Sequence, residues 1–135
     1  MRLDEASCRA RVAAARVGRL ATVGDDLRPH VVPVTYAVHG DLVFVGIDQK
    51  PKTTTDLKRL RNIAANERVA VLVDEYDEDW THLWWVRLDG TARVRADEPA
   101  AIELLAAKYP QYAGDPPRGP MITIHVDGWT GWSYA

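Results

Sequence analysis

Two apolar runs joined by a tight turn occupy residues 29–47, in the stretch PHVVPVTYAVHGDLVFVGI. The first run is rich in valine, and the second, which starts at Leu42, carries only apolar side chains and one glycine. His-Gly-Asp at 39–41 is typical of a turn between antiparallel strands, so the stretch predicts a β-hairpin. Pro33 interrupts the first run. Because proline cannot donate a ladder hydrogen bond, it indicates an edge strand, a bulge or a place where the sheet opens.

The segments on either side of this hairpin add two helices and a strand. Residues 4–16 are alanine-rich with scattered arginines, which is typical of a helix, and residues 20–23 form a short strand closed by a Gly-Asp-Asp turn. Leucine and isoleucine recur at three-residue spacing over residues 57–63. This spacing predicts a helix that one of the threonines at 53–55 caps.

The second half of the chain continues with strands and one further helix. Asp-Gly at 89–90 divides the residues 83–95, and it predicts either the turn of a hairpin or a bulge within one long strand. The other expected elements are a strand at 68–73, a helix at 98–109, a loop at 111–120, and a strand at 121–126 with an extension at 129–134.

The order of these elements decides between fold classes. The strands do not alternate one by one with helices, so a parallel doubly wound sheet is not expected. Six or seven short strands joined by hairpins predict a closed antiparallel barrel with helices packed outside, which leaves no strand edge exposed. A length of 135 residues, with 47% apolar and 27% charged side chains, fits one globular domain over residues 1–135.

The composition excludes several classes of protein. The net charge of −2 gives no general basic field, so nucleic-acid binding is not expected. Cys8 is the only cysteine and the four histidines stand far apart, so neither a disulfide nor a metal site is expected. No apolar run approaches the ~20 residues that cross a membrane. The N-terminal residues are also too charged for a signal peptide, and a cytoplasmic protein without membrane association is expected.

Nucleophilic hydrolysis finds little support in the sequence. The two serines, Ser7 and Ser133, lie at opposite ends of the chain, and no Gly-x-Ser-x-Gly elbow occurs. Cys8 falls in the alanine-rich helix, where a small packed residue is its expected role. A serine or cysteine hydrolase is therefore not expected.

Lysine is concentrated at one place in the sequence. Three of the four lysines, Lys50, Lys52 and Lys58, lie within nine residues, around Pro51 and a run of threonines that starts at Thr53. This segment joins an apolar strand to the start of a helix, where free backbone N–H groups and the helix dipole favour an anion. The pattern predicts an anion cradle suited to phosphate. A solvated charged turn before a well-capped helix is the alternative.

Five tryptophans are many for a chain with a single phenylalanine. Trp84 and Trp85 are adjacent, so on a strand they point to opposite faces. Trp129 and Trp132 lie near the C-terminus. Such side chains can pack the core and a dimer interface, or they can line a pocket for a flat aromatic cofactor.

Several of these stretches resemble a known family. Residues 18–23 (GRLATV) and 29–36 (PHVVPVTY) are similar to the first barrel strands of the pyridoxamine 5'-phosphate oxidase-like superfamily of FMN-binding split β-barrels. Other stretches resemble its actinobacterial branch of type B flavin/deazaflavin oxidoreductases, which use coenzyme F420. These stretches are 48–52, 57–63, 66–69, and 84–87 with Gly90.

The resemblance implies a mainly β fold, a six- or seven-stranded antiparallel split β-barrel with flanking helices. It also implies a homodimer with a cofactor groove at the interface. The expected cofactor-binding residues are Val32, Pro33, Val34, Thr35, Lys50, Lys52, Thr53, Lys58 and Trp132. The first four would run beside the cofactor ring, and the lysines with the threonine of the cradle would hold the phosphate. The tryptophan, supplied by the partner subunit, would cover the ring.

The implied activity is that of an oxidoreductase, which transfers hydride between F420 and an electron-poor small molecule such as an alkene, an imine or a quinone-like acceptor. The alternatives are an FMN-dependent enzyme and a non-catalytic protein that binds F420, FMN or haem. No catalytic side chain is assigned; His30 and Tyr36 are candidate proton donors, with a structural role as the equal alternative for both. No arginine follows Trp129, where pyridoxamine phosphate oxidase carries an arginine-rich substrate segment, so that oxidation is not expected.

Overall fold

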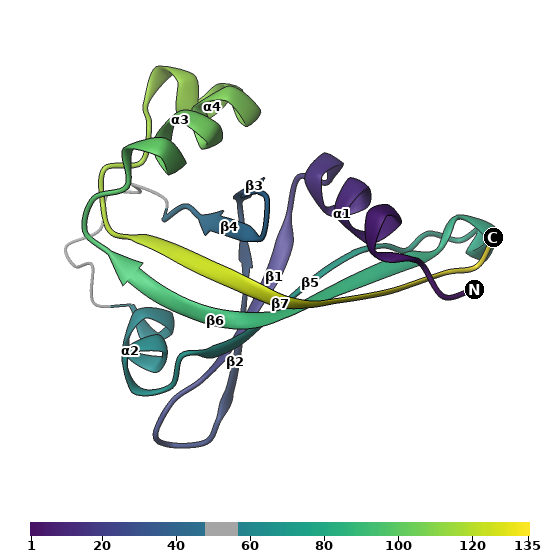
Figure 1. The fold of residues 1–135 in the computed structure, drawn as a ribbon, viewed down its shortest axis with the longest axis horizontal. Helices are drawn as coiled ribbons and strands as arrows, with labels where there is room; N and C mark the ends of the chain where they lie inside the picture. Colours follow the sequence, from purple (N-terminus) through teal and green to yellow (C-terminus); the bar gives the residue numbers. More distant parts are fainter. Residues whose placement is uncertain (48–56) are drawn as a thin grey trace.

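The computed structural model describes residues 1–47 and 57–135 and shows a mainly β chain with helices on both sides of a curved sheet (Figure 1). The helices are α1 (Glu5–Ala14), α2 (Lys58–Ala65), α3 (Pro99–Lys108) and α4 (Pro110–Gly114), with a short 3-10 turn η1 (Trp80–His82). The strands are β1 (Gly18–Val23), β2 (Pro29–Val34), β3 (Tyr36–His39), β4 (Leu42–Val45), β5 (Arg68–Glu75), β6 (Trp84–Arg95) and β7 (Met121–Ser133). None of the helices in the described part is long and apolar enough to cross a membrane.

All seven strands of the described residues belong to one antiparallel sheet, in the order β2-β1-β5-β6-β7-β4-β3. Its edge strands, β2 and β3, are consecutive in the chain and are joined only by Thr35. A one-residue connection is too short to turn two strands back on each other, since the tightest common hairpins use two. The expectation of a closed barrel is therefore wrong, and the split barrel that the resemblance implies is confirmed.

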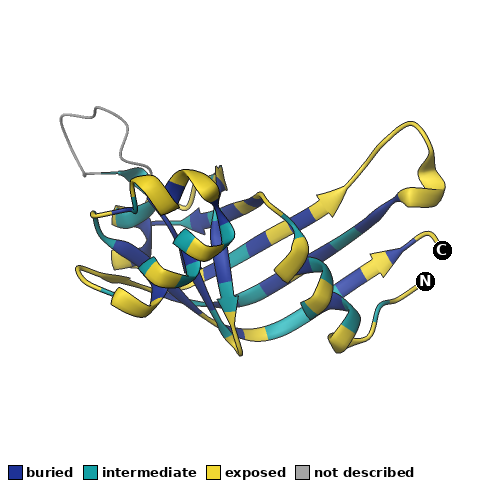
Figure 2. Cartoon of the chain, turned by 90° about the horizontal axis from the view of Figure 1, so that it is seen from above, coloured by how far each residue is buried: buried dark blue, intermediate teal, exposed yellow. Residues whose placement is uncertain are grey.

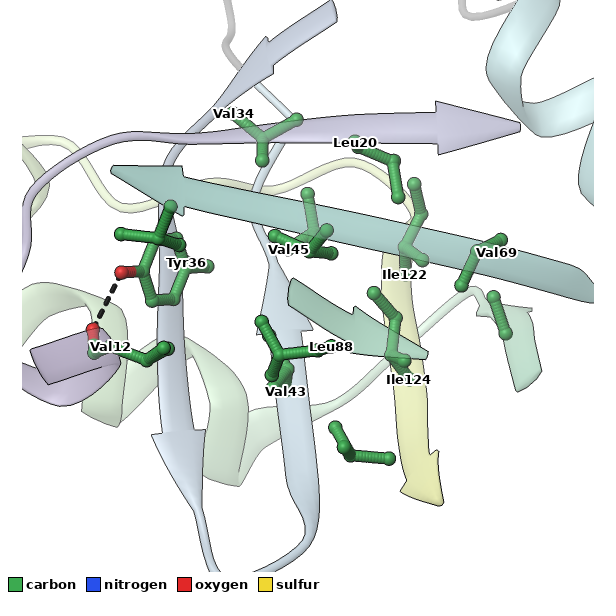
Figure 3. Packing of buried hydrophobic residues seen from close by; sticks show 14 of the residues in the cluster. Val12, Leu20, Val34, Tyr36, Val43, Val45, Val69, Leu88, Ile122 and Ile124 are labelled. Carbon is green, nitrogen blue, oxygen red and sulfur yellow. Dashed lines mark hydrogen bonds between the residues drawn. The ribbon is translucent and has the colours of Figure 1, made fainter. Parts of the chain in front are cut away.

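The side chains on one face of the curled sheet form the main core, which α1 and α2 help to close (Figure 3). Its fully buried members include Leu20, Val43, Val45, Leu88, Ile122 and Ile124. Burying side chains of this kind stabilises the fold by roughly 1.5–3 kcal/mol each. A second cluster lies under α3 and α4, where Leu105 and Tyr112 pack against Phe44 of β4 and Met121 of β7.

The first apolar run of the quoted stretch forms two strands, not the single strand expected. Its break falls after Val34, and β3 begins at Tyr36. Pro33 lies within β2, opposite Arg19, and β2 is an edge strand, so the edge interpretation of this proline is confirmed. Proline is tolerated there because one side of the strand has no ladder to complete. The predicted hairpin of β3 and β4 is also confirmed, and Gly40 in its turn has a φ of +60°.

Asp89 and Gly90 lie inside β6, which pairs with β7 along its whole length and shifts register between these two residues. Of the two interpretations of this dipeptide, one long strand with a bulge is confirmed and the hairpin turn is wrong, and the extra residue of the bulge, Asp127, lies on β7. A Cβ atom at Gly90 would lie 2.2 Å from the carbonyl oxygen of His125. Glycine is therefore needed for the close approach of two strands, and not for a turn conformation.

Two further boundaries differ from the expectation. α2 begins directly after Leu57 and has no side-chain cap, so the prediction of a threonine cap is wrong. Its position is set by its apolar face instead, because Leu60 and Ile63 pack on the main core. The loop expected at 111–120 contains most of α4, which starts at Pro110 because proline suits the first turn of a helix.

The sheet extends beyond the helices at one end of the molecule. β5, β6 and β7 continue toward the end where both termini lie, and the connection between β5 and β6 is mostly exposed there (Figure 2). β7 runs to Ser133 without interruption, so the expected extension of the last strand is confirmed.

Candidate cofactor site

The segment Val32–Thr35 lies at a free edge of the sheet, and we call it the β2 edge. β2 pairs with β1 on one side, and no strand of the described residues pairs with its other side. Val34 is buried and Val32 half-buried, and both pack on the main core, whereas Pro33 is exposed. Main-chain polar groups along a free edge need a partner from solvent or a ligand. The predicted ring-binding segment therefore has an edge that a planar, hydrogen-bonding group can approach.

Thr35 ties this edge to α4 and to the end of β4. Its hydroxyl lies 2.8 Å from the hydroxyl of Tyr112, and its carbonyl accepts a hydrogen bond of 3.2 Å from the N–H of Gly46. A Cβ atom at Gly46 would lie 3.3 Å from the same Tyr112 hydroxyl, so these three residues pack closely. The end of β2 is thus held beside the end of β4. In the sequence, β4 is the strand that precedes the predicted phosphate segment.

A second set of hydrogen bonds fastens Tyr36, the next residue. Its N–H donates to the Tyr109 hydroxyl at 3.1 Å, and its carbonyl accepts from Lys108 Nζ at 3.1 Å. The Tyr109 hydroxyl also lies 2.9 Å from the carbonyl of Arg16. Lys108 Nζ sits 4.0 Å from the centre of the Tyr36 ring, within cation–π range. Burial, with a smaller contribution from the Arg16 charge, lowers the pKa of Lys108 to about 8.

The two candidate proton donors stand differently in the structure. Tyr36 is fully buried, its hydroxyl donates to the carbonyl of Val12, and burial raises its pKa well above the ordinary value (Figure 3). Of its two expected roles, proton donor or structural residue, this placement supports the structural one. His30, on β2, is half-buried, and its Nδ1 is enclosed without a hydrogen-bond partner among the described residues. Since an unsatisfied buried nitrogen is unfavourable, His30 stays a candidate for contact with a ligand.

The start of α2 is fixed against the turn between β1 and β2. Lys58 Nζ donates to Asp26 Oδ2 at 3.0 Å, and this bond lowers the pKa of Asp26. Deeper in the fold, Asn62 Nδ2 donates to Thr22 Oγ1 at 3.0 Å. A Cβ atom at Gly24 would lie 2.4 Å from the side-chain oxygen of Asn62, so the turn can approach the helix only with glycine at this position.

The rest of the predicted anion cradle, Lys50, Lys52 and Thr53, lies outside the described residues, and its contact with phosphate stays a prediction. The structure describes Ile47 and Leu57 on either side of it in the sequence. Lys58 is the one member that is described, and its ammonium group already has the carboxylate of the β1–β2 turn as partner.

The tryptophans of β6 and β7 occupy both faces of the extended end of the sheet. Trp84 is buried, and its Nε1 donates to Glu75 at 2.9 Å, whereas Trp85 is half-buried opposite Trp132 of β7. The predicted opposite orientation of the adjacent pair is confirmed. Trp132 is 36% exposed and forms an isolated bridge with Arg2. Its contact with a cofactor of the partner subunit stays a prediction.

The sheet face opposite the core exposes apolar and basic side chains, and we call it the outer face. One row of it, in register across five strands, consists of Pro33, Arg19, Leu72, Arg87 and Thr130. Leu72 is 40% exposed, and Val31 in the neighbouring row is 61% exposed. Apolar side chains exposed together on a sheet are typical of interaction surfaces.

A groove of about 510 Å³ lies between the end of α2 and residues 92–95 of β6. Its charged side chains already have opposite partners, Arg93 with Glu67 and Arg95 with Glu98, each at 3.8 Å. Of the expected cofactor-binding residues that the structure describes, none lines this groove, so we take the β2 edge and not the groove as the candidate site.

The fold and the free β2 edge define the class of protein as a split barrel of the pyridoxamine 5'-phosphate oxidase type. The chain matches the family described as pyridoxamine 5'-phosphate oxidase over residues 5–133, and it belongs to that family.

Individual relatives agree with this assignment. A 5a,11a-dehydrotetracycline/5a,11a-dehydrooxytetracycline reductase of Streptomyces rimosus is 39% identical over 61 residues, which cover 43% of this chain and only 39% of the reductase. A conserved hypothetical protein of Mycobacterium tuberculosis has a TM-score of 0.76 at 23% identity, over 98% of this chain and 86% of the other. An FAD-binding protein of Mesorhizobium loti has a TM-score of 0.74 at 24% identity, over 97% and 95% of the two chains. At these identities the two structures support the fold alone.

Sequence reasoning missed the residues that hold the β2 edge in place. Lys108, Tyr109 and Tyr112 lie at the junction of α3 and α4, partly in the segment expected to be a loop, and no motif marks them. The available signal is that Lys108 is the one lysine outside the basic cluster. Asp26 is part of the expected turn, where its pairing with a lysine 32 residues away is not visible from the sequence.

Proposed function

We propose that this chain is an oxidoreductase that uses coenzyme F420 to transfer hydride to or from an electron-poor small molecule. The free β2 edge carries the proposal, because it offers main-chain groups at the segment that the resemblance assigns to the cofactor ring. Membership of the pyridoxamine 5'-phosphate oxidase family supports it. When bound, F420 supplies the hydride chemistry through the carbon centre of its deazaflavin ring, and the protein supplies orientation and a dry environment.

The residues present fit such a group. The β2 edge would hold the pyrimidine side of the ring through main-chain hydrogen bonds, with Pro33 contributing no N–H. Lys50 and Lys52, with the hydroxyl of Thr53, would hold the phosphate, and Lys58 contributes less because Asp26 already shares its charge. Trp132 of the partner subunit would exclude water from the open face of the ring.

The preference for F420 over a flavin rests on charge beyond the phosphate. F420 carries a phospholactate and glutamate tail that FMN lacks, and Arg59 and Arg61 follow Lys58 within α2. Not all three can face one groove, because neighbouring positions on a helix point in different directions. A short basic trail after the phosphate cradle therefore supports the longer acidic cofactor.

A flavin is the second candidate cofactor. An anion cradle made of lysines and a threonine suits the phosphate of FMN as well as that of F420. The structural relative from Mesorhizobium loti is an FAD-binding protein, which also favours a flavin. The enzyme would then use the same edge and the same cradle.

The substrate class follows from the proposed hydride transfer. Hydride adds to an electron-poor centre, such as a conjugated alkene, an imine or a quinone-like ring. The Streptomyces rimosus relative is a reductase of dehydrotetracyclines, which supports an acceptor with a conjugated double bond. Because the match covers only part of that reductase, the tetracycline skeleton itself is not proposed as substrate.

A homodimer is part of the proposal. The outer face leaves Leu72 and Val31 in contact with solvent in a single chain, and a second copy would cover them. A dimer also provides the second subunit whose Trp132 the cofactor groove requires.

The test is a parallel titration of the purified protein with F420 and with FMN. Binding is monitored through the quenching of tryptophan fluorescence. We expect F420 to bind at least roughly ten-fold more tightly, which corresponds to about 1.4 kcal/mol. An equal or reversed preference would overturn the choice of F420 in favour of a flavin. Absence of binding by both would overturn the proposed function. Turnover is then tested by following the oxidation of reduced F420 in the presence of conjugated enones and quinones.

A further inference from the structure

The crossover between the two edge strands, Thr35 and Tyr36, is held largely from outside the sheet. Thr35 belongs to neither strand, and Tyr36 is the first residue of β3. At this point the chain leaves one edge of the sheet order and enters the other. Of the contacts described above, only the bond from Gly46 comes from a residue adjoining the sheet. Apart from the bond of the Tyr36 hydroxyl to the Val12 carbonyl of α1, the remaining contacts come from α3, α4 and the residue between them.

Three side chains at the junction of α3 and α4 make these contacts, and we call Lys108, Tyr109 and Tyr112 the α3–α4 clamp. Tyr112 contacts the Thr35 hydroxyl, Tyr109 accepts the N–H of Tyr36, and Lys108 donates to the Tyr36 carbonyl. Both polar main-chain groups of Tyr36 are therefore bound by the clamp.

The hydrogen-bond arrangement within the clamp is specific. The Tyr109 hydroxyl lies 3.0 Å from the Tyr36 carbonyl and 2.9 Å from that of Arg16, but it has one proton to donate. The Tyr36 carbonyl has two lone pairs and can accept from both Lys108 and Tyr109, so either carbonyl can receive the Tyr109 proton, and the Arg16 carbonyl is the nearer of the two. The clamp thereby connects the crossover to the end of α1 as well. The two tyrosine rings support each other edge to face, with 5.7 Å between their centroids.

The clamp also reaches the end of β4. A Cβ atom at Gly46 would touch the Tyr112 hydroxyl and Leu105 of α3, both at 3.3 Å. One hydroxyl group therefore contacts the end of the β2 edge and the end of the strand that precedes, in sequence, the predicted phosphate segment. The distance and orientation between the end of the β2 edge and the end of β4 decide whether the protein can hold the ring and the phosphate of one cofactor at the same time.

We propose that the α3–α4 clamp positions the β2 edge for the cofactor, with Tyr109 and Tyr112 as positioning residues that do not touch the cofactor themselves. This inference rests on the proposed function. The edge can bind a planar ring through several hydrogen bonds only if its main chain is held in one conformation before binding. An edge strand that ends in a one-residue crossover lacks a second strand to do this, and the clamp takes that place.

The test uses substitutions that remove a hydroxyl and keep the ring. Tyr112→Phe and Tyr109→Phe each delete clamp hydrogen bonds, and Thr35→Val deletes the same bond as Tyr112→Phe from the other side. The matched control is Tyr134→Phe, because the Tyr134 side chain is 53% exposed and its hydroxyl has no partner among the described residues. Melting curves confirm that each variant folds.

Two quantities are measured on each variant. Hydrogen exchange of the ligand-free protein reports the crossover, and we expect the Tyr36 amide of Tyr109→Phe to exchange roughly ten-fold faster. Fluorescence titration reports the dissociation constant for F420 or FMN, whichever the wild type binds. We expect it to rise roughly three- to ten-fold in Tyr109→Phe and Tyr112→Phe, as loss of one hydrogen bond implies. The double variant Thr35→Val/Tyr112→Phe should lose no more affinity than either single variant.

The outcomes separate the two proposals. A wild-type protein that binds a cofactor, with unchanged dissociation constants in both tyrosine variants, overturns the positioning role even if exchange becomes faster. An equal loss in Tyr134→Phe overturns it as well. A wild-type protein that binds neither F420 nor FMN overturns the proposed function and, with it, the role of the clamp at a cofactor site.

Discussion

Replacing Gly90 by alanine tests the close approach of β6 and β7 at the bulge. The added methyl group would lie 2.2 Å from the carbonyl oxygen of His125 and 3.1 Å from the side chain of Ile124. Ordinary contact requires the strands to separate by about 1 Å, in the longest paired region of the sheet, and overpacking of this kind costs roughly 3 kcal/mol. The expected fall in Tm is about 10 °C for a domain of this size.

The measurement is a pair of denaturant and thermal unfolding curves, with Gly119→Ala as control. A Cβ atom at Gly119 meets no atom of another residue within 4 Å, so this substitution should leave stability unchanged or raise it slightly. Gly90 does not have a positive φ, so the predicted loss comes from steric contact alone. A loss of unfolding free energy below about 1 kcal/mol would refute the close approach. Such a loss would be no larger than the conformational penalty for alanine at a turn.

Three other predictions concern the site, the assembly and the pH dependence. Lys52→Ala should weaken cofactor binding by roughly 1.5–3 kcal/mol, the value of a charge-assisted hydrogen bond. The control Arg118→Ala, at an exposed ion pair, should leave binding unchanged. An unchanged dissociation constant in Lys52→Ala would contradict the assignment of this lysine to the phosphate. Leu72→Asp should convert the expected dimer into monomers at micromolar concentration. The control Leu27→Asp, at a 78% exposed position in the β1–β2 turn, should leave the dimer intact. Light scattering measures the oligomeric state, and a monomeric wild type would contradict the proposed dimer interface. Folding lowers the pKa of Lys108 from 10.5 to about 8, so between these values the unfolded chain binds more protons and stability should rise with pH. After allowance for partial solvent screening the rise is about 1–2 kcal/mol. Denaturant midpoints at pH 7 and 9.5 should show this rise in the wild type and lose it in Lys108→Met, and parallel pH profiles would contradict it.

Most of the strands and helices could be predicted because their signals are local. The β3–β4 hairpin needs only two apolar runs and a glycine turn, and α1 needs only a helical composition with Asp4, which caps it through the Ser7 N–H. Pro33 is likewise informative by itself, because a residue without an N–H is excluded from the middle of a sheet. These features depend on neighbours in sequence, so the pattern alone identifies them.

The errors fall where a distant partner decides the local structure. Asp-Gly at 89–90 has the composition of a turn, but pairing with β7 on both sides of it keeps it within one strand, with a shift of register there. The threonines before α2 have the composition of a cap, but the packing of Leu60 and Ile63 places the start of the helix after Leu57. In each case the free energy of burying apolar surface and completing a ladder exceeds the few tenths to about 1 kcal/mol of a local preference.

The candidate site shows the same division. The lysine cradle could be named from its composition, and the role of the β2 edge from the resemblance to a known family. The pairing of Lys58 with Asp26 and the contacts of the α3–α4 clamp could not be, because they join residues 32 and more than 70 positions apart.

The sequence by itself determined most of the strands and helices, that Pro33 marks an edge, a bulge or an opening of the sheet, and which family the chain resembles. Only the tertiary structure decided that the sheet stays open between β2 and β3, that β6 is one continuous strand beside a bulge in β7, and that the junction of α3 and α4 holds the crossover between the sheet edges. Local preferences for helix, strand or turn depend on residues that are neighbours in the sequence. Strand order and long-range hydrogen bonds depend on which surfaces can be buried together.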